Sequence, residues 1–143
     1  MKLGVAGLAM TAVLATGAFA ATPKPMSVDE SASFLIDSAT TEQLWKENTP
    51  ARVVKLYPSG KFRFVSEVGG GFTDNKTCVV SARAMLLPVV RLPVQGRKLV
   101  YAPVKAATAF DAAPNLTQAQ CQALARTKLK DAIQSVTSAL AAN

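Results

Sequence analysis

The clearest hydrophobic pattern lies near the C-terminus, where apolar residues recur every three or four positions. They form one continuous stripe: Cys121, Leu124, Ala125, Leu129, Ala132, Ile133, Val136 and Leu140. Polar residues occupy the opposite face: Gln122, Arg126, Lys130, Gln134 and Ser138. Thr117 and Gln120 have the spacing of a capping box, in which each side chain binds the other's backbone N–H. The pattern predicts a long amphipathic helix that covers one face of a sheet.

In the middle of the chain the period changes to two, which predicts strands. Residues 61–68 put Phe62, Phe64, Ser66 and Val68 opposite Lys61, Arg63, Val65 and Glu67. Residues 77–87 place one set on a common face: Cys78, Val80, Ala82, Ala84 and Leu86. We expect further strands at 52–57 and 98–105, with Pro88 and Pro93 marking an edge, a bulge or an irregular stretch.

The connections are predicted from small and turn-forming residues. A turn at 58–60 would join 52–57 and 61–68 into a hairpin. The three glycines 69–71, together with residues 74–76, predict the next connection. Residues 106–114 are interpreted as a small-residue crossing that leads to the last helix. Strands joined by such short links favour an antiparallel meander.

The N-terminal part of this region carries helix signals. Ser27 and Glu30 have capping-box spacing, which predicts a helix over 27–39. A second short helix is expected around Trp45, and Pro50 would close the helical region. Trp45 is expected to pack in the core, and a ligand-stacking role is the alternative. The predicted fold class is therefore α+β: a helical N-terminal segment, an antiparallel meander of four or five strands, and a long C-terminal helix on one sheet face.

Residues 1–20 differ in character from the rest. One basic residue, Lys2, precedes an apolar run of small residues that ends in Ala18, Phe19 and Ala20. This pattern predicts a signal peptide cleaved near Ala20, and an uncleaved membrane anchor is the alternative. Residues 21–143 would then form a single secreted domain, located in a bacterial periplasm or outside the cell. Any other membrane contact is expected to be peripheral.

An oxidising destination decides how the two cysteines are interpreted. Cys78 and Cys121 are the only cysteines and are 43 positions apart. A disulfide between them is the expected arrangement. The alternative is a reactive thiol at Cys121, since the first turn of a helix favours the thiolate.

The composition excludes several chemistries. The chain of 143 residues has no His, which removes Ser-His-Asp and Cys-His catalysis and every metal site that contains His. No paired-acid motif occurs, and Asp74 with Asn75 offers too few ligands for calcium. We therefore expect no catalysis, cofactor or metal. A small hydrolase that uses Ser and Lys residues distant in sequence remains an alternative.

Positive charge is concentrated in the predicted sheet. Residues 51–110 contain 10 basic and 2 acidic residues, a net charge of +8, whereas residues 22–50 carry −3 and residues 111–143 carry +1. The candidate residues for binding an anionic partner are Lys55, Lys61, Arg63, Arg83, Arg97 and Lys98, with Arg91 and Lys105 nearby. The alternative is an ordinary solvated sheet face. Nucleic acid is the weakest candidate partner, because among the basic residues Tyr57 is the only clear candidate for an exposed aromatic.

These observations predict a non-enzymatic periplasmic or secreted binding or accessory protein. Its basic sheet face would dock an anionic envelope component or an acidic protein. One alternative is an inhibitor or immunity-type protein that binds a toxin or hydrolase, with the acidic N-terminal segment or the loop at 69–76 as the plug. The sequence leaves the oligomeric state open.

Overall fold

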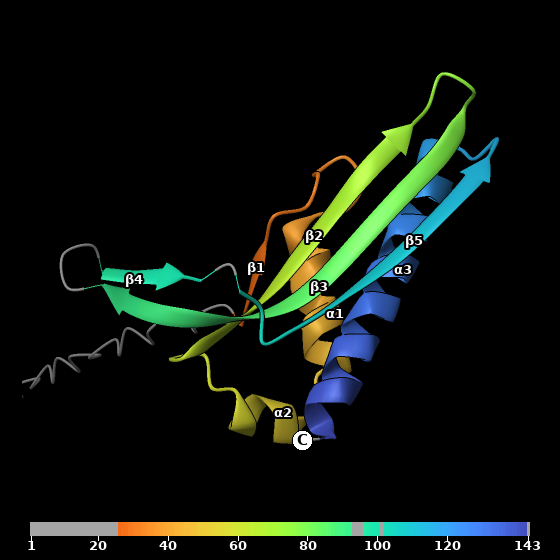
Figure 1. Ribbon diagram of the computed structural model, residues 1–143. Coiled ribbons are helices and arrows are strands. Elements are labelled where there is room, and N and C mark those ends of the chain that lie inside the picture. Colours follow the sequence, from red (N-terminus) through yellow and green to blue (C-terminus); the bar gives the residue numbers. More distant parts are fainter. Residues whose placement is uncertain (1–25, 93–95, 101, 143) are drawn as a thin grey trace, which may run out of the picture.

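The computed structural model describes residues 26–92, 96–100 and 102–142. Along the chain lie β1 (Ser27–Asp29), α1 (Ser38–Asn48), α2 (Ala51–Leu56), β2 (Phe62–Phe72), β3 (Thr77–Leu92), β4 (Gly96–Leu99), β5 (Lys105–Pro114) and α3 (Gln118–Ala141) (Figure 1). The predicted signal peptide at 1–20 and Pro93 lie outside the described residues. The predicted α+β class is confirmed. No helix in the described part of the chain is long and apolar enough to cross a membrane.

The sheet is built around β3, which is 16 residues long. Its neighbour on one side is β2, antiparallel, and β1 lies beyond β2 in parallel orientation. On the other side, β5 pairs with residues 77–86 and β4 with residues 89–92. Between β5 and β4 the regular pairing stops opposite Leu87 and Pro88. Pro88 has no N–H to donate, so a break in the ladder there is the irregularity that its position in the sequence predicts.

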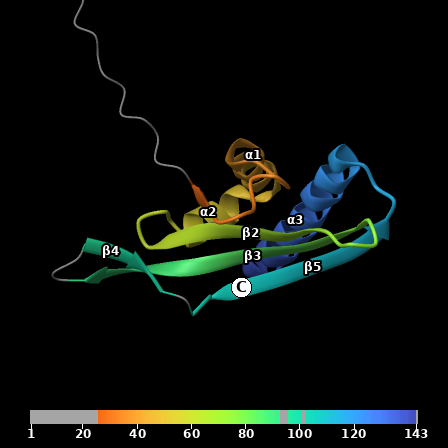
Figure 2. The ribbon, with the colours of Figure 1, turned by 90° about the horizontal axis from the view of Figure 1, so that it is seen from above.

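The three helices lie on one side of the sheet (Figure 2). The predicted inward residues of β3 are confirmed, because Cys78, Val80, Ala82, Ala84 and Leu86 are all fully buried. The α3 stripe packs on them, with Leu124 the one member that stays partly exposed. The capping box of Thr117 and Gln120 is also confirmed. The core therefore lies between the sheet and α3, and α1 adds the buried Trp45.

The side of the sheet that faces away from the helices is called the outer face below. A second, smaller apolar cluster occupies it. Val65, Met85 and Leu87 are buried there, and Val28 and Ala106 pack beside them. The outer face is therefore not uniformly polar.

The predicted helix over 27–39 is wrong. Ser27–Asp29 is the short parallel strand β1, and α1 begins only at Ser38, after the cap residue Asp37. The Glu30 N–H donates to the carbonyl of Ser66, and the Ser31 N–H donates to the Asp29 carboxylate. Pairing with a strand distant in sequence thus outweighs the local capping-box signal.

The predicted strand at 52–57 is also wrong, and with it the hairpin to 61–68. Residues 51–56 form α2, and only Val53 of this helix is buried. Pro50 precedes the first residue of α2, where a missing N–H has no cost, so this proline ends one helix and starts the next. The turn at 58–60 leads from α2 into β2.

Two further expectations about the strands are corrected. The connection predicted at 69–71 and 74–76 is correct only in its second part, because β2 runs through the three glycines to Phe72 and the turn is at residues 73–76. Residues 106–114 are not a crossing but most of β5, because small side chains fit in a strand beside α3. The strand expected at 98–105 is divided, since β4 ends at Leu99 and β5 begins at Lys105.

Candidate functional site

The outer face carries three of the basic residues that the sequence predicts for it. Side chains alternate along a strand, so the strand register assigns each residue to a face. Arg63 pairs with Leu87, and Glu67 pairs with Arg83, which places all four on the outer face. Lys61 has the same alternation, immediately before β2 begins. The structure thus brings Lys61, Arg63 and Arg83 to one side of the sheet.

Arg63 and Arg83 share this face without touching. Their register positions are separated by four residues, or about 13 Å along the strands. Val65 and Met85 lie between them. The two arginines therefore lie at separate positions along the strands and do not form one compact cluster.

The two arginines also differ in how available they are. The Arg63 side chain is only 9% exposed, and its Nη1 donates a 3.0 Å hydrogen bond to the Phe62 carbonyl. Arg83 is exposed. Among the side chains that the structure describes, Arg83 forms no ion pair, although Glu67 is its register partner. Arg83, like the exposed Lys61, is therefore available to a ligand, whereas Arg63 is not.

Arg83 borders a shallow hollow of about 610 Å³ in the sheet. The lining consists mainly of residues with small side chains: Glu67, Gly69, Gly70, Ser81, Arg83, Ala106, Ala107 and Thr108. The hydroxyls of Ser81 and Thr108 lie in the register rows beside Arg83. One guanidinium with two neighbouring hydroxyls can bind a carboxylate or phosphate group by charge-assisted hydrogen bonds.

Of the other candidates, Lys55 and Lys105 lie elsewhere, and the remaining side chains are not described. Lys55 lies on α2, so its assignment to the sheet is wrong. Arg97 and Lys98 lie on β4, and Arg91 lies on the end of β3 that pairs with β4, but the side chains of all three fall outside the described set. Lys105 pairs with the inward-facing Leu86 at the start of β5. Among the side chains that the structure describes, the basic set of the outer face is thus Lys61, Arg63 and Arg83.

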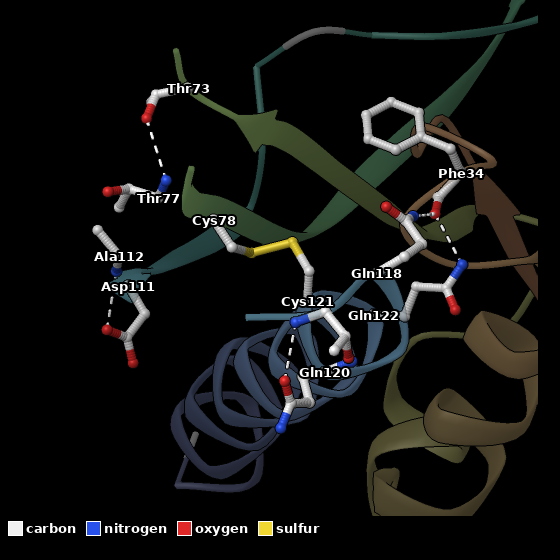
Figure 3. The surroundings of a disulfide bond; sticks show 11 residues. Phe34, Thr73, Thr77, Cys78, Asp111, Ala112, Gln118, Gln120, Cys121 and Gln122 are labelled. Atoms are coloured by element: carbon white, nitrogen blue, oxygen red, sulfur yellow. Dashed lines mark hydrogen bonds between the residues drawn. A yellow bond between two sulfur atoms is a disulfide. The ribbon is translucent and has the colours of Figure 1, made fainter. Parts of the chain in front are cut away.

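The two cysteines form a disulfide, as predicted. It joins Cys78 of β3 to Cys121 in the first turn of α3, with the Cα atoms 5.8 Å apart (Figure 3). Both residues are fully buried. The alternative of a reactive Cys121 thiol is therefore wrong for this structure. A buried disulfide of this kind is typical of proteins from oxidising compartments.

A second hollow lies on the helix side, where the segment before α1 meets α3. It has a volume of about 690 Å³ and is lined in part by Asp37, Gln122 and Arg126. The side-chain amides of Gln118 and Gln122 both donate to the Phe34 carbonyl at 2.9 Å and hold this segment against α3 (Figure 3). These contacts are structural, and so is the role of Asp37, whose carboxylate caps α1 by accepting from the Thr40 N–H.

The sequence does not predict the outer hollow, because the glycines that line it, Gly69 and Gly70, favour a turn at that point in the chain. The available signal was the run of small residues at 106–114, which supplies one wall. Among the described residues, no group of three His, Cys, Asp or Glu side chains is placed to hold a metal ion.

No family model matches the chain, and comparisons with curated proteins and with solved structures found no match. Function is therefore inferred from the chemistry of the outer face.

Proposed function

We propose that this chain is a non-catalytic binding or accessory protein that docks an anionic partner on the outer face of its sheet. The observation that carries the proposal is the position of Arg83. Its side chain is exposed, borders the hollow beside Ser81 and Thr108, and shares a face with Lys61 and Arg63.

The charge balance of the outer face supports this proposal. Among the described side chains, Glu42 pairs with Lys46 within α1, and Lys128 of α3 contacts Asp111 and Asp131. These contacts engage one lysine of α1 and one of α3, and the partner in β5 is the acidic Asp111. The basic residues of the outer face have only Glu67 as an acidic register neighbour. The field over that face is therefore positive.

The compartment narrows the class of partner. A disulfide together with a predicted signal peptide favours a site outside the cytoplasm. Anionic groups available in a bacterial envelope include phospholipid headgroups, lipopolysaccharide phosphates, wall polymers and acidic proteins. The proposed partner is an anionic envelope component or an acidic protein of that compartment.

The test is binding of the protein to vesicles that contain phosphatidylglycerol, and to heparin, from about 50 to 500 mM salt. We expect binding to fall steeply with salt and R83E to weaken it strongly. K130E is the matched control, since Lys130 is exposed on α3 and the charge change is the same. Binding that does not change with salt concentration would contradict the proposal, and so would an equal loss of binding in R83E and K130E. If the protein binds neither the vesicles nor heparin, and the wild type but not R83E captures one acidic protein, the partner is a protein.

A further inference from the structure

β5 is a free edge of the sheet among the described residues. It pairs with β3 along its whole length, and no other described strand lies on its far side (Figures 1 and 2). An edge strand of ten residues presents a row of unpaired N–H and C=O groups to any second strand.

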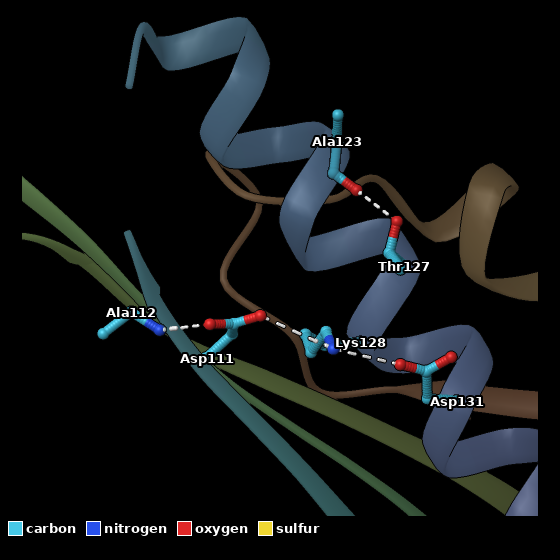
Figure 4. Close-up of polar contacts among 6 residues, drawn as sticks. All are labelled: Asp111, Ala112, Ala123, Thr127, Lys128 and Asp131. Carbon is cyan, nitrogen blue, oxygen red and sulfur yellow. Dashed lines mark hydrogen bonds and ion pairs between the residues drawn. The ribbon is translucent and has the colours of Figure 1, made fainter. Parts of the chain in front are cut away.

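The hydrogen bonds show which backbone groups of β5 point toward the free edge of the sheet. The Asn115 N–H donates to the Lys76 carbonyl, just beyond the last register pair of β3 and β5. In an antiparallel ladder the bonded positions alternate. The backbone N–H and C=O groups of the odd-numbered residues of β5 therefore bond to β3, and those of the even-numbered residues point away from β3, toward the free edge. One outward N–H, that of Ala112, is already bound by the Asp111 carboxylate at 2.8 Å (Figure 4). The free edge is therefore the stretch 106–110.

Residues 105–111 of β5 are complementary to themselves when two copies run antiparallel with Thr108 opposite Thr108. Lys105 and Asp111 lie three positions on either side of Thr108, so the lysine of one copy meets the aspartate of the other. On the outer face, Phe110 of one copy lies beside Ala106 of the other. Phe110 is 64% exposed, and the small side chain of Ala106 leaves room for its ring.

Neighbouring registers lack these matches. With Ala109 at the centre, Ala112 would need the N–H that Asp111 already binds, and Lys105 would face Ala113. With Ala107 at the centre, Lys105 would face Ala109, and Asp111 would have no basic partner within the strand. Charge and hydrogen bonding thus favour the register centred on Thr108.

We infer that two copies of this chain pair through β5 in that register and form a continuous sheet across a two-fold axis. In each copy Ala106, Thr108 and Phe110 donate and accept the backbone hydrogen bonds across the axis. Asp111 also contacts Lys128 at 3.5 Å, but its side chain is 44% exposed and remains accessible to a second lysine. This pairing does not depend on the proposed function.

The axis stands perpendicular to the sheet, which has a functional consequence. It keeps both α3 helices on one side and both outer faces on the other. Two Arg83 side chains would then face the same way, and an extended anionic partner could engage both. Edge pairing alone buries little area, so we expect a concentration-dependent dimer.

The first test uses proline at the centre of the pairing. The Thr108 N–H points away from β3, so T108P removes no hydrogen bond within the chain, whereas it blocks pairing across the axis. We expect sedimentation velocity to show a monomer–dimer equilibrium for the wild type and for T108A, and a monomer for T108P with an unchanged melting temperature. A wild type that stays monomeric at all concentrations would overturn the inference, and so would a T108P protein that dimerises like T108A.

The second test addresses the register. Charged residues on an edge strand can also prevent pairing, so the test must show whether changing these charges weakens or strengthens dimerisation. K105E and D111K each place like charges opposite one another, and we expect each variant alone to be monomeric. An equimolar mixture of the two should form the mixed dimer, since each contact then joins an acidic to a basic side chain, and the double variant K105E/D111K should dimerise. If the mixture stays monomeric, the register is wrong; if the single variants dimerise more strongly than the wild type, the charges guard the edge.

Discussion

The indole Nε1 of Trp45 donates a 2.6 Å hydrogen bond to the hydroxyl of Ser66, and both residues are fully buried. This bond joins α1 to β2 across the core. The Trp45 ring also packs against Phe64, with centroids 4.8 Å apart. The expected core position of Trp45 is confirmed, and Ser66 is the polar partner that a buried indole N–H requires.

Replacing Ser66 tests how much this bond contributes. S66A leaves the indole N–H buried without an acceptor, which costs about 1–3 kcal/mol of the free energy of unfolding. Urea denaturation followed by Trp45 fluorescence measures the change. S135A is the control, because Ser135 is exposed on α3 and its loss should shift the midpoint little. Equal midpoints for S66A and S135A would show that the bond contributes nothing.

The disulfide should supply a large share of the stability. It closes a loop with a sequence separation of 43 residues, and restriction of the unfolded chain by such a loop is worth about 4 kcal/mol. We expect the double variant C78A/C121A to unfold at much lower urea, and the wild type to do the same only after reduction in denaturant. Reductant should leave the double variant unchanged. Alkylation of both thiols in the native protein would contradict a buried disulfide.

The cap of α1 predicts a dependence of stability on acid pH. The Thr40 backbone N–H donates to the Asp37 carboxylate at 2.8 Å and lowers the pKa of Asp37 below its ordinary value of 3.8. The folded pKa is below the unfolded one, so the stabilisation is complete above about pH 5 and is lost as the pH falls through the folded pKa. D37N keeps an acceptor at the cap but does not titrate there.

Urea midpoints measured across this pH range test the cap. The difference in urea midpoint between the wild type and D37N should be constant above about pH 5. In acid the midpoint of the wild type should fall relative to that of D37N. D74N, in the exposed turn between β2 and β3, controls for the loss of one carboxylate. Parallel curves for the wild type and D37N throughout would show that the cap does not titrate with folding.

The elements that the sequence predicts correctly are those whose pattern is long and regular. The α3 stripe spans several turns and follows a capping box, and Cys78 shares its face with four other inward residues. These two patterns independently point both cysteines inward, which is why the disulfide and the α-on-β packing follow. The outward placement of Arg63 and Arg83 follows from the same alternation.

The missed elements depend on contacts distant in sequence. Three residues of β1 are too few to show a period, and they form a strand only because β2 offers an edge. β5 is composed largely of alanine, whose small side chain marks neither a strand nor a loop. The hollow beside Arg83 combines residues from β2, β3 and β5, so it could not be assigned before their register was known.

The glycines of β2 give a prediction with its control in the same strand. Gly70 has a φ of +127°, and a Cβ there would overlap the backbone carbonyl of Val79 in the neighbouring strand. G70A should therefore destabilise the protein by about 2 kcal/mol or more, since it adds backbone strain to a steric clash. A Cβ at Gly69 would meet no atom within 4 Å, and this glycine has no positive φ, so G69A should leave the urea midpoint almost unchanged. If the two variants unfold together, the glycines serve only as a flexible connection, and the continuous pairing of β2 with β3 through residues 69–71 is wrong.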